Sequence, residues 1–163
     1  MSKAVLIVII IILILAVIGI AIYLMVAGGR TGGLSLGGSK TFDVQGVKVE
    51  ITQDGTGTAT VKNGDTVSIN YIGSLAADGK QFDSSYDRKM PISFTAGSGQ
   101  VIKGMDVAIV GMKVGEKREM TIPAILAYGD KGIPPIIPAN SDLIFQVELM
   151  GITPGSQAPV QGQ

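Results

Sequence analysis

Short alternations of apolar and polar residues fill the middle of the chain and predict β-strands. Residues 47–51 (Val-Lys-Val-Glu-Ile) and 67–71 (Val-Ser-Ile-Asn-Tyr) alternate as half-buried strands do. Further strands are predicted at 91–95, 116–122 and 143–150, and in the last of these the alternate apolar residues share one face. Together these segments predict an antiparallel sheet.

One short helix is predicted at residues 103–110, because Met105, Ile109 and Met112 fall on one side of it. Residues 123–140 form a long loop with three prolines, and the apolar content of this loop argues against disorder. The predicted fold class is therefore α+β, with a curled antiparallel β-sheet wrapped around one short helix.

A tight turn at residues 78–79 (Asp-Gly) organises the centre of this domain. Glycine adopts positive φ without a Cβ penalty, so the dipeptide can return a strand that ends near Leu75. We expect the turn to bring Tyr71, Phe82 and Asp83 close together. An apolar cleft with a few polar groups is typical of a small-ligand site, although the same residues could be plain core.

A continuous apolar run precedes the strands. Residues 4–27 carry no charge and, as a helix, would extend about 36 Å, which exceeds a hydrocarbon core of about 30 Å. They predict a single transmembrane signal anchor after a three-residue flank, 1–3. A cleaved signal peptide is the alternative, but its apolar region is usually about 7–15 residues long.

Glycine, serine and proline delimit the rest of the chain. Residues 28–40 are rich in glycine and serine and predict a flexible linker, whereas residues 153–163 predict a disordered tail. The domain between them spans 41–152. Lys3 and the α-amino group lie before the apolar run, so the small excess of positive charge favours a cytoplasmic N-terminus and an extracytoplasmic domain.

Composition narrows the chemistry. Lysine and arginine number 13, as do aspartate and glutamate, so there is no basic excess to attract nucleic acid. Cysteine and histidine are absent, which excludes disulfides, thiol nucleophiles, histidine-based triads and the usual zinc sites. We therefore expect no cofactor, no metal and no nucleic-acid partner.

Eight short motifs occur in a characteristic order. They are Tyr71-x-Gly, Asp78-Gly79-Lys80, Phe82-Asp83-Ser84-Ser85, Gln100-Val101-Ile102-Lys103-Gly104, Met112-x-Val114-Gly115-Glu116, Ala127-Tyr128-Gly129, Ile136-Ile137-Pro138-Ala139-Asn140 and Leu143-x-Phe145-x-Val147-Glu148-Leu149. No single motif is decisive. The ordered series resembles the FKBP-type peptidyl-prolyl cis–trans isomerase family over about residues 46–152, and the resemblance implies an FKBP-like fold.

The implied activity is acceleration of X–Pro isomerisation in unfolded or exported chains. The uncatalysed step crosses a barrier of about 18–20 kcal/mol and breaks no covalent bond, so a chain without nucleophiles or metal can catalyse it. A non-catalytic module that binds proline peptides and a membrane-tethered chaperone are the alternatives.

The resemblance assigns roles to individual residues. It implies catalytic roles for Phe82, Asp83 and Tyr128. The implied substrate-binding residues are Tyr71, Phe82, Asp83, Arg88, Val101, Ile102, Met105, Tyr128, Ile137 and Phe145. Phe94 matches an aromatic at the pocket margin, whereas Tyr86, Asp87, Gln100 and Lys103 read as surface residues. Without the resemblance, Asp83 would read as a turn residue or as a partner of Arg88.

The chain also departs from the family pattern. Many members have tryptophan where this chain has Met105, and an aromatic where it has Ile92. Methionine fills space but defines its shape less well, which affects the expected binding of macrolide inhibitors more than the fold. The expected partners are proline-containing polypeptides, macrolide inhibitors and membrane lipid through residues 4–27.

Overall fold

A computed structural model describes residues 40–155. The predicted anchor at 4–27, the linker up to residue 39 and the tail from residue 156 lie outside the described residues, so these predictions stay predictions. Among residues 40–155, no helix has the length and apolar character needed to cross a membrane.

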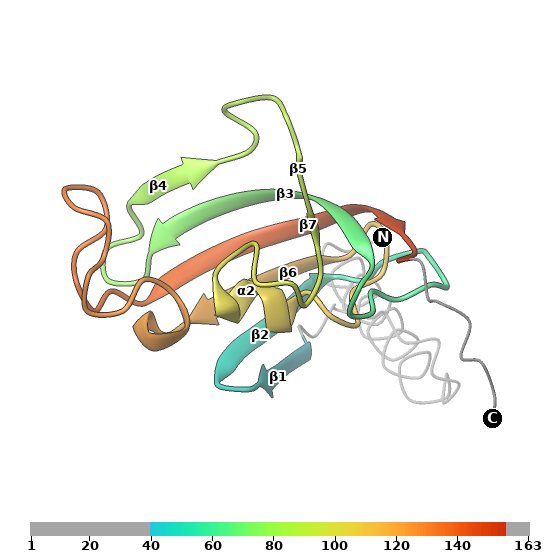
Figure 1. Cartoon of the computed structure of the whole chain (residues 1–163), viewed down its shortest axis with the longest axis horizontal. Coiled ribbons are helices and arrows are strands. Elements are labelled where there is room, and N and C mark those ends of the chain that lie inside the picture. Colours follow the sequence, from blue (N-terminus) through green and yellow to red (C-terminus); the bar gives the residue numbers. More distant parts are fainter. Residues whose placement is uncertain (1–39, 156–163) are drawn as a thin grey trace, which may run out of the picture. The chain divides into compact units, whose positions relative to one another are not determined.

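One antiparallel sheet dominates the described part of the chain (Figure 1). Its strands are β1 (Lys40–Val44), β2 (Val47–Gln53), β3 (Thr66–Leu75), β4 (Gln81–Ser84), β5 (Ile92–Thr95), β6 (Lys117–Ile122) and β7 (Leu143–Thr153). Their order is β1-β2-β6-β7-β3-β4, and β5 also pairs with β3. A short helix, α2 (Lys103–Ala108), and a 3-10 turn, η1 (Ala124–Leu126), complete the fold. The predicted combination of an antiparallel sheet and one short helix is confirmed.

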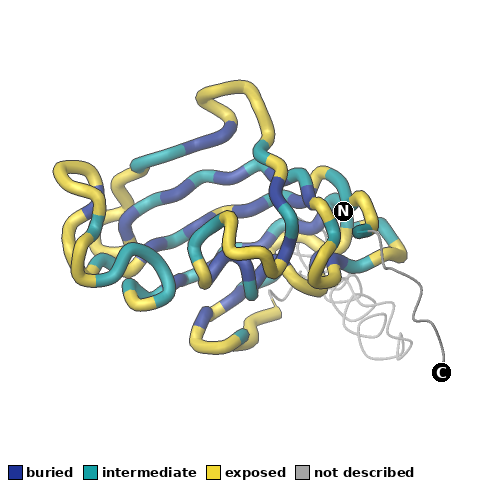
Figure 2. The backbone as a smooth tube through the Cα atoms, in the orientation of Figure 1, coloured by how far each residue is buried: buried dark blue, intermediate teal, exposed yellow. Residues whose placement is uncertain are grey.

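Burial follows the pleat of the sheet (Figure 2). In β3, every second residue from Val67 to Leu75 is buried, and in β7 the same holds from Leu143 to Leu149. These two central strands pair along their whole length. Because successive side chains alternate between faces, one face of the sheet is apolar and packs against α2. The alternation of apolar and polar residues that predicted these strands therefore also identifies the face of the sheet that is buried in the core.

The first strand was not predicted. Lys40, assigned to the linker, begins β1, which pairs with β2 through a two-residue hairpin. Both turn residues, Gln45 (φ 51°) and Gly46 (φ 90°), have positive φ, as a type I′ turn requires. Asp43 supports the turn, since its Oδ1 accepts the Gly46 N–H at 2.9 Å.

Several predicted boundaries were wrong by a few residues. β7 continues past residue 150, and Thr153, assigned to the tail, pairs with Thr66. The helix ends at Ala108 rather than at residue 110. β5 begins after Pro91, a residue that has no N–H to donate to a sheet. These differences do not move any predicted core residue to the other face.

A buried ion pair attaches α2 to the sheet. Glu116 and Arg118 are 4% and 5% exposed, and Arg118 Nε donates to Glu116 Oε1 at 2.6 Å. Arg118 Nη1 also donates to the carbonyl oxygens of Ala108 at 2.7 Å and Val110 at 3.2 Å, both at the C-terminal end of the helix. The helix is therefore held at a fixed position over the sheet, and its N-terminal end forms part of the site.

Candidate active site

A cavity of about 300 Å³ opens between the core face of the sheet, α2 and the 123–140 loop. The residues that line it are Tyr71, Phe82, Asp83, Ile92, Gln100, Val101, Ile102, Met105, Tyr128 and Phe145. Strands β3, β4 and β7 contribute Tyr71, Phe82 and Phe145, and the segment that leads into α2 contributes Val101 and Ile102. The structure thus brings together segments that are far apart in the sequence.

Aromatic rings form one wall. Tyr71 on β3 and Phe145 on β7 are inward-facing, with ring centroids 5.9 Å apart. Phe82 on β4 meets Phe145 edge-on, with ring centroids 5.6 Å apart and an interplanar angle of 78°. Edge-to-face pairs of this kind are favourable because ring faces carry negative and ring edges positive charge density. The three rings therefore form a continuous, mainly aromatic wall.

A carboxylate lies at the edge of this wall. The Tyr71 hydroxyl donates to Asp83 Oδ2, and Arg88 Nη1 donates to Asp83 Oδ1. Arg88 Nη2 donates to the Tyr71 hydroxyl at 2.8 Å, and the Ser84 N–H donates to Asp83 Oδ1 at 2.8 Å. Burial alone would raise the pKa of Asp83, but these hydrogen bonds and the charge of Arg88 outweigh it and lower the pKa. Asp83 is therefore a fixed negative charge at neutral pH.

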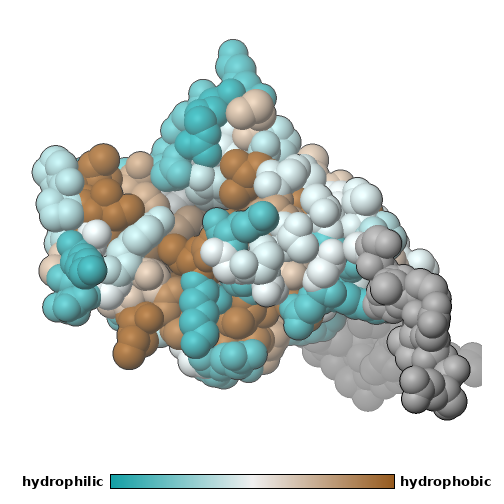
Figure 3. Space-filling view, in the orientation of Figure 1, coloured by the Kyte–Doolittle hydropathy of each residue, from teal (hydrophilic) through white to brown (hydrophobic). Residues whose placement is uncertain are grey.

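Tyr128 stands on the opposite side, just after η1. Burial and then the charge of Asp83 raise the pKa of its hydroxyl, so the group stays protonated and can donate a hydrogen bond. The surrounding loop presents apolar side chains to solvent: Ile125 is 86% exposed and Ile136 is 52% exposed. Figure 3 shows apolar surface in this region among polar surroundings.

The remaining wall comes from the start of α2. Ile102 is the residue before the helix, and its carbonyl accepts the Asp106 N–H at 3.1 Å. Met105, in the first turn of the helix and 3% exposed, lines the cavity beside it. Met105 therefore forms this part of the cavity surface.

Comparison with known proteins agrees with this arrangement. A model of the FKBP-type peptidyl-prolyl cis-trans isomerase family matches residues 57–150. The chain belongs to this family. Its relatives include FK506-binding protein 1A of Neurospora crassa, which is 52% identical over 109 residues that make up 67% of this chain and 90% of that protein. FK506-binding protein 1A of Aspergillus fumigatus is 49% identical over 107 residues, 66% of this chain and 95% of that protein. Peptidyl-prolyl cis-trans isomerase FPR2 of Saccharomyces cerevisiae is 53% identical over 89 residues, 55% of this chain and 66% of that protein.

Eight of the ten residues predicted to bind substrate line this cavity. Arg88 does not line it but contacts Asp83 and Tyr71, which do. Ile137 does not line it either: it is 3% exposed and packs in the core. The contacts of Arg88 with Asp83 and Tyr71 form the network that the resemblance implies, whereas the prediction that Ile137 binds substrate stays a prediction.

Two lining residues were absent from the predicted set. Ile92 begins β5, and the resemblance places it at the pocket edge as a departure from the family pattern rather than among the substrate-binding residues. Gln100, predicted to be a surface residue, lies at the cavity although it is exposed, and its Oε1 accepts the Thr95 N–H at 2.9 Å. The position of Gln100 directly before Val101, a predicted substrate-binding residue, is the sequence feature that could have indicated its place at the cavity. Among residues 40–155, no group of three or more acidic side chains is placed to hold a metal ion.

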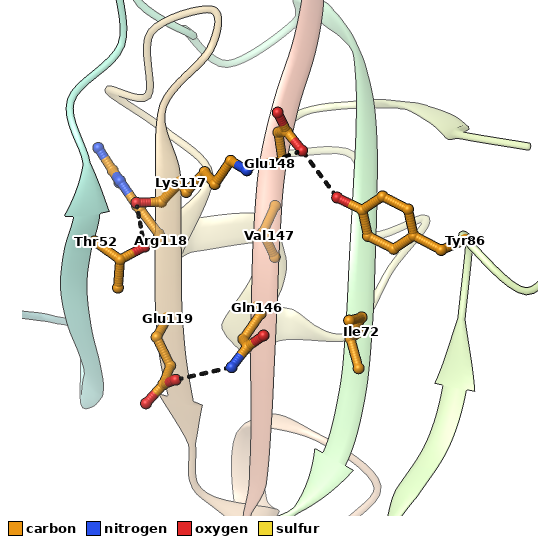
Figure 4. A pocket seen from close by; sticks show the side chains of 9 residues that line it. All are labelled: Thr52, Ile72, Tyr86, Lys117, Arg118, Glu119, Gln146, Val147 and Glu148. Atoms are coloured by element: carbon orange, nitrogen blue, oxygen red, sulfur yellow. Dashed lines mark hydrogen bonds and ion pairs between the residues drawn. The ribbon is translucent and has the colours of Figure 1, made fainter.

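A second cavity, of about 260 Å³, lies on the opposite face of the sheet (Figure 4). Its polar groups bind one another: the Tyr86 hydroxyl donates to Glu148 Oε2 at 2.8 Å, and Gln146 Nε2 donates to Glu119 Oε2 at 3.3 Å. A proline ring bound here would break these hydrogen bonds and could not replace them, because the ring has no polar group. The aromatic cavity is therefore the better candidate for the isomerase site.

Proposed function

We propose that this isomerase binds proline in the aromatic cavity and accelerates rotation about the preceding peptide bond in unfolded or exported chains. The observation that carries the proposal is a carboxylate, Asp83, held at the edge of a mostly apolar cavity beside Phe82 and Phe145. The proline ring would contact the two phenylalanines and Met105. The carbonyl before proline would face Asp83 and Tyr128.

The cavity can favour the transition state in two ways. A twisted amide is less polarised by resonance than a planar one, so transfer to an apolar cavity costs it less. The negative charge of Asp83 would disfavour the charge separation of the planar form. Each tenfold gain in rate requires only about 1.4 kcal/mol of preference for the twisted form.

Hydrogen bonds would fix the substrate on either side of the proline. Tyr128 has a protonated hydroxyl at the cavity edge, which supports a role as donor to a substrate carbonyl. The backbone N–H of Ile102, at the start of α2, is the second proposed donor. Macrolide inhibitors would use the same cavity, with affinity limited by Met105.

The proposal places the enzyme at a membrane surface. Residues 4–27 would be the single-pass anchor, with a cytoplasmic N-terminus and an extracytoplasmic isomerase domain. Residues 28–39 would reach about 17–21 Å as a glycine-rich coil, which keeps the domain near emerging chains. Protease treatment of intact cells tests this topology: digestion of the domain is expected, and its protection would reverse the orientation.

Turnover by the full chain in detergent tests the enzymatic part. A peptide with an apolar residue before proline should isomerise faster than in buffer, and both Phe82→Ala and Asp83→Ala should lower kcat/KM about tenfold or more, which corresponds to a loss of about 1.4 kcal/mol of preference for the twisted form. Asp87→Ala is the matched control, because Asp87 is exposed and binds only the side chain of Gln81 among the described residues. Binding of the peptide without acceleration would instead support the non-catalytic binding module.

A further inference from the structure

Asp106 is a buried carboxylate that the proposed mechanism does not use. It lies on α2 next to Met105, and it is 8% exposed. Its two oxygens accept backbone N–H groups from one loop: Gly97 donates to Oδ1 at 2.7 Å and Gly99 donates to Oδ2 at 2.9 Å. The carboxylate therefore connects the helix to the segment that precedes it.

The loop held by Asp106 leads directly into the cavity wall. Residues 97–99 are Gly-Ser-Gly, and Gln100, Val101 and Ile102, which all line the cavity, follow without interruption. Both glycines have positive φ, 78° and 74°, and neither has a side chain that could pack against the core. Backbone hydrogen bonds, rather than side-chain packing of the two glycines, therefore attach this loop to the helix.

A second set of bonds holds the same loop from β5. The Ser98 N–H and hydroxyl both donate to the Thr95 carbonyl oxygen, at 3.3 Å and 2.6 Å. These bonds tie the loop to the sheet, whereas Asp106 ties it to the helix. The loop before the wall at 100–102 is thus attached both to the sheet and to the helix that carries Met105.

We propose that Asp106 is a positioning residue for the isomerase site: it fixes the wall formed by Val101 and Ile102 relative to the floor formed by Met105, and so sets the affinity for proline peptides. The proposal rests on the proposed function of the cavity. Asp106 itself does not line the cavity, and it acts through the backbone of the loop. Its loss should weaken ground-state and transition-state binding alike, which raises KM more than it lowers kcat.

Asp106→Asn in the full chain is the central test. Asparagine keeps the shape, but its amide group can accept only one of the two N–H groups and presents its own donors to the other. We expect KM to rise about tenfold with kcat within about threefold of the wild-type value. The dissociation constant for the same proline peptide, measured by titration calorimetry, should rise in parallel.

Asp65→Asn is the matched control. Asp65 also accepts two backbone N–H groups, from Lys62 at 2.9 Å and Gly155 at 3.0 Å, but it lies outside the cavity. The Asp65→Asn variant should lower the urea midpoint of unfolding and leave KM unchanged. If Asp106→Asn also lowers the midpoint and leaves both KM and the dissociation constant unchanged, Asp106 is only structural and the proposal is overturned.

A second pair of variants keeps the test decisive if Asp106→Asn fails to fold. Gly99→Ala strains the same loop at positive φ without meeting another atom within 4 Å, whereas Gly115→Ala introduces similar strain beside Thr56. Only Gly99→Ala should raise KM; equal values for both variants would contradict the proposal. If the wild type binds the peptide but does not turn it over, the proposed function fails, and the dissociation constants still decide the role of Asp106.

Discussion

Gly73 on β3 lies directly against the ring of Phe82. A Cβ atom at position 73 would lie 2.7 Å from Phe82 Cζ and 2.9 Å from Phe145 Cε1, which is closer than real Cβ contacts allow. The two rings can therefore meet edge-on only because β3 has no side chain at this position. The Tyr71-x-Gly motif thus supplies a cavity residue, Tyr71, and also the side-chain-free position, Gly73, against which Phe82 and Phe145 pack.

Gly73→Ala should consequently damage the site more than the fold. The methyl group must displace Phe82 or Phe145, at a cost of about 1–3 kcal/mol in the free energy of unfolding, and kcat/KM should fall about tenfold or more. Gly151→Ala is the control, because a Cβ on this β7 residue meets nothing within 4 Å. Parallel urea unfolding and isomerisation assays separate the two effects; a fully active Gly73→Ala variant would show that the rings tolerate displacement.

The pH dependence of turnover should be flat near neutrality. The pKa of Asp83 lies below its ordinary value of about 3.9, and the pKa of Tyr128 lies above its ordinary value of about 10. The chain has no histidine that could titrate between them. We expect kcat/KM to be constant from about pH 5 to about pH 9 and to fall only under more acidic or more alkaline conditions.

The sign of the acid limb follows from the lowered pKa. The stabilisation that ionised Asp83 contributes is fully present above its unfolded-state pKa and is lost as the pH falls through the lower folded-state value. Turnover depends on the same ionised carboxylate in the proposed mechanism. Asp83→Asn should lower kcat/KM at neutral pH and remove the decline at acidic pH that protonation of Asp83 causes. A rate profile with an inflection between pH 6 and pH 7 would show that another group controls turnover.

Tyr71→Phe tests the support of Asp83 without changing the apolar wall. The variant removes the hydroxyl that donates to Asp83 and accepts from Arg88 at 2.8 Å, while it keeps the ring next to Phe145. Asp83 would then be held less firmly, and kcat should fall several-fold with little change in KM. Tyr86→Phe is the control, because the Tyr86 hydroxyl binds Glu148 on the outer face. Equal kcat values for the two variants would contradict this role.

The aromatic cavity was accessible from the sequence because its members sit in strands and ordered motifs. Strict alternation in β3 and β7 puts Tyr71 and Phe145 on the buried face, and the turn at 78–79 returns Phe82 to them. These are local patterns whose spatial consequence follows from the period of a strand. The main strands and most of the pocket could therefore be predicted.

Features that depend on backbone partners could not be predicted in the same way. Asp106 binds two backbone N–H groups that have no side-chain signature in the sequence. β1 follows a glycine-rich run, and its sequence shows no clear alternation of apolar and polar residues. It is recognised as a strand from its pairing with β2 across the turn at Gln45 and Gly46. Arg118 did leave a signal: it shares the buried face of β6 with Met120 and Ile122.

Breaking the buried pair formed by Glu116 and Arg118 should cost far more stability than breaking the exposed pair formed by Lys40 and Asp54. Arg118→Met leaves Glu116 buried without its cation and leaves the Ala108 carbonyl without its donor. The free energy of unfolding should fall by about 3–5 kcal/mol.

Two further variants separate the charge from the packing. Lys40→Ala, which breaks a pair whose side chains are 67% and 73% exposed, should change the free energy of unfolding by less than about 1 kcal/mol. Glu116→Gln combined with Arg118→Met should recover part of the loss, because no charge then remains buried without a partner. Urea unfolding of the four proteins measures these differences. If Arg118→Met costs no more than Lys40→Ala, the pair does not hold α2 on the sheet, and the position of the cavity floor must depend on apolar packing alone.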